Sequence, residues 1–240
     1  MSKALEQDMQ QLRNALREMS EIAISMVADV IEGLVKRDNS KFAKIHENED
    51  KVNQLEMKLD DMAWKTIALR QPMATDLRFI IVAIKINPLL ERIGDEAVNI
   101  LKKVEYLITV PLLKPLIDTP RMCEKVIWAL SASMDTIYNG DTDLAREICW
   151  EDREIDELRD QIYRELMTYM QDSPDNIQRA LQLLFIAKSL ERIGDLATDI
   201  AEDAIYLHQS KDIRHHAEDD EEFKKHCRKK TGSITQQIRS

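Results

Sequence analysis

The chain has 240 residues, of which 44% are hydrophobic and 32% are charged, so it can bury a core and is no disordered tail. Its formal net charge of -10 argues against bare nucleic acid as the main partner, because phosphate contacts need a basic face. We expect a soluble, reduced, cytoplasmic protein. The three cysteines are far apart, the start has no apolar signal-peptide core, and no apolar run is long enough to span a membrane.

The first half of the chain predicts three helices. Apolar residues recur three and four positions apart, which is typical of amphipathic helices, and nothing alternates with period two for long enough to make a sheet. Ser40 and Thr75 are candidate N-caps for the second and third helices. The predicted helices are 3–36, 41–70 and 76–108.

The second half predicts three more helices after a proline-rich linker. Thr119 followed by Pro120 is typical of an N-cap and first helical position, and Gly140 is typical of a helix end. Ser173 with Pro174 repeats the starting signal. The predicted helices are 119–139, 143–171 and 174–209.

Two pairs of segments show that the halves are copies of one unit. The segment ERIGDEAVNI begins at Glu91 and ERIGDLATDI begins at Glu191, an offset of 100. Upstream, EDKVNQLE from Glu49 aligns with DREIDELR from Asp152, an offset of 103. Because this period exceeds that of solenoid repeats, we predict an all-α fold of two tandem antiparallel three-helix bundles. The predicted parts are bundle 1–110, linker 111–119, bundle 120–209 and polar tail 210–240, which we expect to be partly disordered.

Acidic stripes on the third and sixth helices need an explanation. Like charges four residues apart destabilise a helix by roughly 0.2–0.5 kcal/mol per pair, and a mid-helix glycine such as Gly94 or Gly194 costs about 1 kcal/mol. Glycine permits close helix approach, and aligned carboxylates offer oxygens to a cation. The stripes are Glu91, Asp95 and Asn99 in the first copy and Glu191, Asp195 and Asp199 in the second.

The second and fifth helices supply a candidate facing wall for each stripe. Glu49 with Asn53, and Asp152 with Asp156, are again four residues apart. An all-oxygen donor set favours hard cations over a structural zinc site. The alternative is a solvated acidic face, which the neighbouring Arg92 and Arg192 neutralise as surface ion pairs.

These motifs resemble the PhoU family of phosphate-signalling regulators over about residues 3–209. The doubled ERIGD-x-A-x-[N/D]-I is joined by ALRQPMATDLR before the third helix, PLLKPLIDTPRM in the linker and REIDELRDQIYRELMTYMQDSP in the fifth helix. The resemblance implies two three-helix bundles with pseudo-twofold symmetry. It also implies multinuclear metal clusters of iron, zinc, manganese or magnesium held by E-x-x-x-D motifs on the bundle surface.

Carried onto this chain, the implied metal ligands occupy ten positions. Asn53 and Asn99 each offer one neutral oxygen where a carboxylate is possible, so we expect the first site to bind metal more weakly. The positions are Glu49, Asn53, Glu91, Asp95 and Asn99 in the first half and Asp152, Asp156, Glu191, Asp195 and Asp199 in the second.

The implied function is negative regulation of phosphate uptake and of the phosphate-starvation response. The family bridges the phosphate transporter ATPase subunit and a membrane sensor histidine kinase, so we expect membrane contact only through partners, and we expect a homodimer. The sequence has no P-loop, dinucleotide fingerprint or nucleophile elbow, which indicates that it is not an enzyme.

Two other functions stay open at this stage. A metal-free helical adaptor would have the same helix pattern. A carboxylate di-iron enzyme would use Glu-x-x-His motifs, but no histidine has a glutamate three residues before it, and only His215 has an acid there. A minor metal site in the tail, formed by His215, His216, His226 and Cys227, competes with a scattered polar surface.

Overall fold

The fold is all-helical over the residues that the structure describes. The computed structural model describes residues 3–213, and within them there is no strand. The predictions that fall on the tail, including its partial disorder and its minor metal site, lie outside the described residues. The helices are α1 Lys3–Lys36, α2 Phe42–Arg70, α3 Ala74–Leu107, α4 Asp118–Asn139, α5 Thr142–Asp172, the short 3-10 helix η1 Pro174–Asn176, and α6 Ile177–Gln209.

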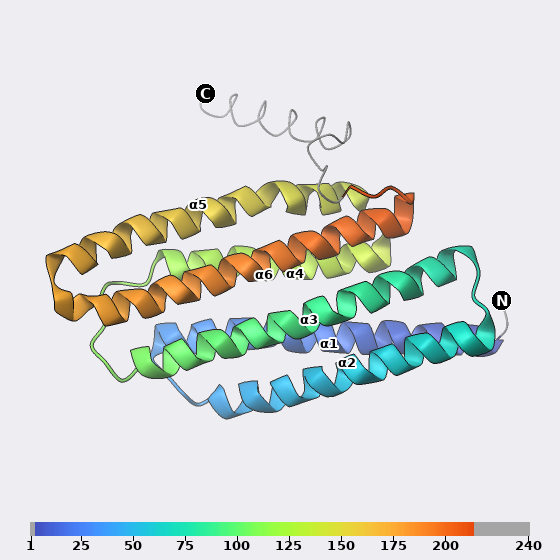
Figure 1. Cartoon of the computed structure of the whole chain (residues 1–240), viewed down its shortest axis with the longest axis horizontal. Coiled ribbons are helices and arrows are strands. Elements are labelled where there is room, and N and C mark those ends of the chain that lie inside the picture. Colours follow the sequence, from blue (N-terminus) through green and yellow to red (C-terminus); the bar gives the residue numbers. More distant parts are fainter. Residues whose placement is uncertain (1–2, 214–240) are drawn as a thin grey trace, which may run out of the picture.

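The helices form two three-helix bundles that lie side by side, as predicted. Helices α1, α2 and α3 pack together, and α4, α5 and α6 form the second bundle. The bundles meet where α3 packs against α6 and α1 packs against α4, so α2 and α5 lie on opposite outer edges (Figure 1). One continuous set of buried side chains runs through both bundles. The two copies therefore share a core along their length rather than meeting at a small interface.

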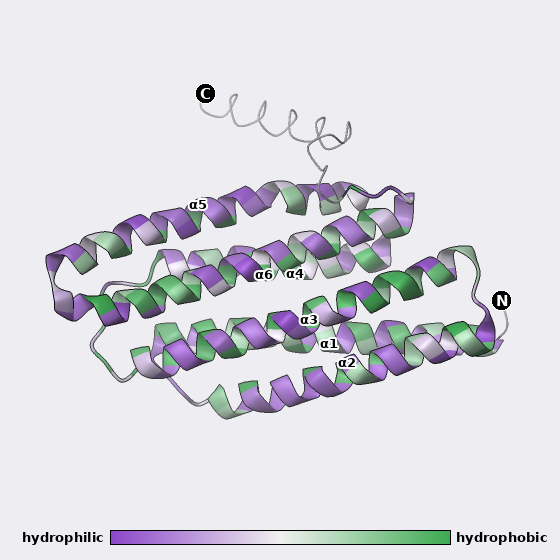
Figure 2. Cartoon of the chain, viewed as in Figure 1, coloured by the Kyte–Doolittle hydropathy of each residue, from purple (hydrophilic) through white to green (hydrophobic). Residues whose placement is uncertain are grey.

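The hydropathy pattern explains which helices lie outside. Helix α5 buries few side chains and is hydrophilic over most of its visible surface, as is much of α2 (Figure 2). Helix α3 buries side chains over nearly its whole length because it packs against α1, α2 and α6. It also continues through Pro88, although proline removes a backbone donor.

Two of the predicted helix boundaries are confirmed by their backbone. Gly140 follows α4 with φ of 76°, and its N–H donates to the Thr136 carbonyl, which is a typical helix end. The Ser173 side chain accepts a hydrogen bond from the Asp175 N–H, and Pro174 begins η1, which leads into α6.

The three predicted threonine and serine N-caps of α2, α3 and α4 are wrong. Helix α2 begins at Phe42, and the Ser40 hydroxyl donates to Asp38 instead. Thr75 lies inside α3, which begins at Ala74. Thr119 lies inside α4 and is only 2% exposed, so its side chain is packed in the interior rather than at a solvated helix end.

The helices of residues 3–213 include none that is both long and apolar enough to cross a membrane.

Over the same residues Cys123 and Cys149 are free thiols, and burial raises the pKa of the Cys123 thiol to about 12. A thiol with so high a pKa carries little thiolate at neutral pH and is unreactive.

Candidate functional site

The two repeat-motif glycines show that both copies pack in the same register. A methyl group added to Gly94 would lie 3.5 Å from Val52 of α2, and one added to Gly194 would lie 3.1 Å from Ile155 of α5. Val52 and Ile155 are 103 residues apart, and the glycines are 100 apart, as the repeat alignment predicts. The predicted close approach is therefore present at Gly194, while Gly94 is in ordinary van der Waals contact.

The structure brings four of the predicted carboxylates of the second half together between α5 and α6. Burial, together with the charges of Asp195, Asp156 and Glu191, raises the pKa of Asp152 to about 7. Burial also raises the pKa of Asp195 to about 6, again with Glu191 and Asp156 contributing. We call these four side chains the second acidic group: Asp152, Asp156, Glu191 and Asp195.

A cation of the chain itself already occupies this group. The Arg159 Nη1 donates to Asp156 Oδ1 and to Glu191 Oε1, each at 2.7 Å. The Nη2 of the same guanidinium donates to Asp160 at 2.8 Å. Arg159 therefore joins α5 to α6 through the carboxylates that the sequence assigned to a metal. Such charge-assisted hydrogen bonds are among the strong ones in proteins.

The first half has an acid where the second half has this arginine. Glu56 is the equivalent of Arg159 at the offset of 103, and sequence analysis missed it although the alignment contains it. Burial raises the pKa of Glu91, and the charges of Asp95 and then Glu56 raise it further. We call Glu56, Glu91 and Asp95 the first acidic group.

The two predicted ligands on α2, Glu49 and Asn53, lie on the same helix as Glu56 of the first acidic group. Glu49 is half-buried and lies 3.5 Å from the His46 ring nitrogen. Asn53 is also half-buried, one turn from Glu56 on α2. Neither is among the groups that shift the pKa of Glu91 most.

The last member of each predicted stripe lies just over two helical turns beyond the first. Eight residues rotate a helical position by about 80°, so a third stripe residue does not lie below the first. Asn99 accordingly lines a hollow between α3 and α6. Asp199 is exposed, although its charge still raises the pKa of Asp195.

The fit to a metal differs between the two acidic groups. As the side chains stand, residues 3–213 contain no group of three or more His, Cys, Asp or Glu side chains that could hold a metal ion. In the first acidic group the oxygen donors suit a hard cation, and the like charges beside Glu91 are a repulsion that a cation would relieve. In the second, Arg159 takes up one oxygen each of Asp156 and Glu191, while Asp152 and Asp195 keep the like charges that raise their pKa values.

Arg192 does not neutralise the acidic stripe as the alternative interpretation supposed. Its Nη1 lies 3.2 Å from Glu96 Oε1, so the ion pair joins α6 to α3 and thereby one bundle to the other. Arg92 lowers the pKa of Glu91, as a nearby positive charge does.

Comparisons with known proteins agree with this architecture. A model of the PhoU domain matches residues 16–104 and again residues 119–204. A protein of Caulobacter vibrioides strain NA1000, named phosphate-specific transport system accessory protein PhoU homolog, is 37% identical over 201 residues, covering 83% of this chain and 87% of that protein. A protein of the same name from Zymomonas mobilis is 36% identical over 200 residues, covering 83% and 84%.

Solved structures show the same fold. The crystal structure of PhoU from Pseudomonas aeruginosa matches with a TM-score of 0.82 and 31% identity, covering 86% of this chain and 99% of that one. The phosphate transport system regulatory protein PhoU from Streptococcus pneumoniae matches with a TM-score of 0.78 and 21% identity, covering 87% and 98%, and at that identity shows the fold alone.

Proposed function

Because the chain belongs to the PhoU family, we propose that it is a negative regulator of phosphate uptake and of the phosphate-starvation response. The observation that carries this proposal is the pair of PhoU-domain matches, 16–104 and 119–204, together with relatives named as accessory proteins of phosphate-specific transport. The family is regulatory and not enzymatic, so the di-iron enzyme considered from the sequence is excluded.

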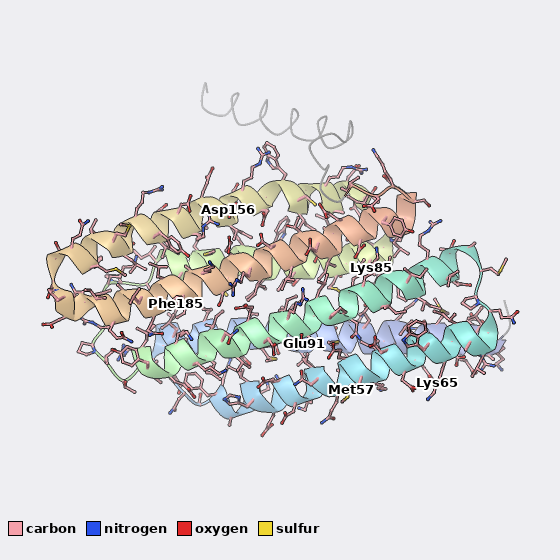
Figure 3. All side chains as sticks on the ribbon, in the orientation of Figure 1. Met57, Lys65, Lys85, Glu91, Asp156 and Phe185 are labelled. Carbon is pink, nitrogen blue, oxygen red and sulfur yellow. The ribbon has the colours of Figure 1, made fainter. Side chains whose placement is uncertain are left out.

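In this proposal the protein works by binding two partners, the transporter ATPase subunit and a membrane sensor histidine kinase. The bundles offer outer helices with exposed apolar side chains on which such proteins can dock. Met57 and Trp64 on α2 are 66% and 63% exposed and lie seven residues apart, so they share one face of the helix (Figure 3 labels Met57). Large exposed apolar side chains of this kind are typical of protein-binding surfaces.

Metal binding is the second part of the proposal, and we place it in the first bundle. Glu56, Glu91 and Asp95 would hold a hard cation, with Glu49 and Asn53 beside them. The carboxylate count alone favoured the second bundle, but that count omitted Glu56 and Arg159. The guanidinium that bridges Asp156 and Glu191 in the second acidic group, and the additional acid Glu56 in the first, support the opposite order.

A metal-free adaptor is the second candidate function. It is favoured by the observation that residues 3–213 contain no preformed group of three metal-binding side chains. Metal analysis of protein purified without chelator separates the two: bound metal supports the first candidate, and metal-free protein that still regulates supports the second.

The regulatory role is tested with a phosphatase or transporter-promoter reporter in a strain that lacks the gene. We expect the reporter to stay on at high phosphate in the deletion strain and to be repressed again by the wild-type gene. Complementation with Met57→Asp/Trp64→Asp tests the α2 surface, and we expect it to restore repression poorly.

A matched control for the surface test is Lys44→Asp/Lys51→Asp, which puts two acids at exposed positions of the same helix and should restore repression fully. A reporter that remains repressed in the deletion strain, with no second copy of the gene present, contradicts the regulatory proposal.

A further inference from the structure

We propose that the hollow between α3 and α6 on the Phe185 side binds a small phosphate-bearing anion. The hollow has a volume of about 340 Å³ and is lined by seven residues that include three cations, Lys103, Lys188 and Arg192. We call it the cationic cleft. This inference rests on the cleft alone and does not depend on the proposed regulatory role.

The charges in the cationic cleft are poorly balanced. The net charge of the chain is -10, yet three cations meet here with one acid, Glu96. Glu96 pairs with Arg192 through its Oε1 at 3.2 Å, and its buried Oε2 has no hydrogen-bond partner among the described residues. Among residues 3–213 neither Lys103 nor Lys188 has a hydrogen bond or an ion pair with the protein. Like charges held together without a partner repel one another, and a bound anion would relieve that repulsion.

The internal repeat supplies a control for this observation. Lys85 pairs with Asp203 at 3.1 Å, and Glu96 pairs with Arg192, so α3 and α6 run antiparallel in one register. The residues equivalent to Lys85 and Asp203 at the offset of 100 are Phe185 and Lys103. Both line the cationic cleft, and Figure 3 shows Phe185 toward the opposite end of the helix contact from Lys85.

The equivalent end is closed by the chain's own charges. The Lys85 ammonium pairs with Asp203, which is only 5% exposed, and lies 4.9 Å from the centre of the Tyr206 ring. Arg78 Nη1 donates to the Leu207 carbonyl nearby at 3.0 Å. At the cationic cleft, Lys103 stands at the position equivalent to Asp203, and Phe185 stands at the position equivalent to Lys85. At one end of the α3–α6 contact the lysine is therefore paired with an aspartate of the chain. At the equivalent end, the cleft contains lysines without a partner in the part of the chain that the structure describes, which can bind a ligand.

The remaining lining suits a phosphate group attached to an apolar or aromatic body. Lysine ammonium groups and the arginine fork are the usual partners of phosphate oxygens, and the Ser189 hydroxyl in the wall can donate as well. Phe185 is 47% exposed and offers a ring face beside the cations, on which a nucleobase can stack. The volume lies within the range of small-molecule pockets, about 300–1,000 Å³.

The test is isothermal titration of the full chain with inorganic phosphate and with ATP at constant ionic strength. We expect saturable binding of at least one of them. Lys103→Gln/Lys188→Gln should weaken it at least about tenfold, which is the worth of one charge-assisted contact. Lys44→Gln/Lys51→Gln, which removes two exposed charges of α2 instead, should leave it unchanged.

The two ligands separate the sources of the phosphate group. If ATP binds and Phe185→Ala removes that binding, the ligand is a nucleotide. If inorganic phosphate binds equally to the wild type and to Phe185→Ala, the ligand is free phosphate. Absence of saturable binding of either, or equal affinity in the wild type and in Lys103→Gln/Lys188→Gln, would overturn the proposal.

A second variant introduces at the cationic cleft the ion pair found at the other end of the α3–α6 contact. Phe185→Lys with Lys103→Asp places in the cationic cleft the two residue types that pair at Lys85 and Asp203. We expect this variant to fold with undiminished thermal stability and to lose anion binding. Wild-type affinity in the folded variant would contradict the assignment of the ligand to this cleft.

Discussion

Arg159 and Glu56 are equivalent residues with opposite charges, and they give the two acidic groups different chemistry. In the second bundle the guanidinium lies 2.7 Å from both Asp156 and Glu191, so their charges are satisfied within the chain. In the first bundle Glu56 adds a further negative charge beside Glu91. A single position thus carries opposite charges in the two acidic groups.

If the proposed metal site is correct, substitutions at these two positions should exchange the metal preference of the bundles. We expect Arg159→Gln to gain one class of Mn²⁺ site and Glu56→Arg to lose the site of the first bundle, both measured by calorimetric titration and by metal content after dialysis. A change of affinity of at least about tenfold is expected, because each substitution removes or adds a charge next to the ligands. Arg153→Gln is the matched control, because that guanidinium lies over the Trp150 ring at 4.1 Å on the same helix. Identical metal content in all four proteins would rule the assignment out.

The pH dependence of stability should report Asp152. Its pKa rises to about 7 in the folded chain, against about 3.9 for an ordinary aspartate. The folded state therefore binds the proton more tightly than the unfolded state does, and stability falls as the pH rises from about 4 to about 7. In chelator, Asp152→Asn should remove most of this fall and raise the free energy of unfolding at pH 8 by about 1 kcal/mol. Urea unfolding at pH 5 and pH 8 measures both effects, and an unchanged slope in the variant would contradict the prediction.

At the scale of the helices, the two motif glycines serve different purposes. A methyl group at Gly94 would be 3.5 Å from Val52, which is an ordinary contact, whereas at Gly194 it would be 3.1 Å from the end of Ile155 and 3.4 Å from Asp152 Oδ1. Helix α6 therefore approaches α5 more closely than α3 approaches α2 at the equivalent point. The motif glycine therefore permits close helix packing in the second bundle, whereas in the first bundle an alanine would fit in its place.

Alanine substitution distinguishes these two roles. Gly94→Ala should stabilise the protein by about 1 kcal/mol, because alanine is the better helix former and the methyl group has room. Gly194→Ala should gain less or destabilise, because Ile155 must move. Thermal and urea unfolding of the two variants against the wild type measure the difference, and an equal or larger gain for Gly194→Ala would contradict it.

At the scale of the whole molecule, the shared core couples the two bundles. Helices α3 and α6 pack along their lengths, and the Lys85–Asp203 and Glu96–Arg192 ion pairs cross the same contact. Buried side chains from both bundles form one continuous set. Separating the copies would expose the apolar side of α3 that faces α6, so neither bundle has a complete surface of its own.

The chain should therefore unfold in one transition although it contains two repeats. Tryptophan reports on each bundle separately, since Trp64 lies in α2 while Trp128 and Trp150 lie in α4 and α5. We expect urea midpoints to coincide in Trp128→Phe/Trp150→Phe, which keeps the first-bundle probe, and in Trp64→Phe, which keeps the second-bundle probes. Circular dichroism gives the overall midpoint of each variant. A fluorescence midpoint that differs from the circular dichroism midpoint of the same variant would show that the bundles unfold independently.

The sequence by itself determined the helical class, the duplication and the family. Periodicity, Gly140 and the proline linker are local signals, and the repeated motif is specific enough to carry a resemblance that the domain matches confirm. The N-caps at Ser40, Thr75 and Thr119 failed because each helix begins one or two residues away from the position that the local pattern predicted, and the Ser40 hydroxyl is bound to Asp38 instead.

Only the tertiary structure decided what the acidic stripes face. The sequence predicts acids on both helices of each pair. Whether a guanidinium bridges these acids depends on which α5 side chain reaches α6. The structure shows that Arg159 does, and its equivalent in the first bundle is Glu56. The cationic cleft is likewise a property of two helices 100 residues apart in the chain, because Lys103 and Phe185 meet only when α3 and α6 pack in one register. Contacts between distant segments depend on packing of the whole molecule, and local sequence patterns do not contain that information.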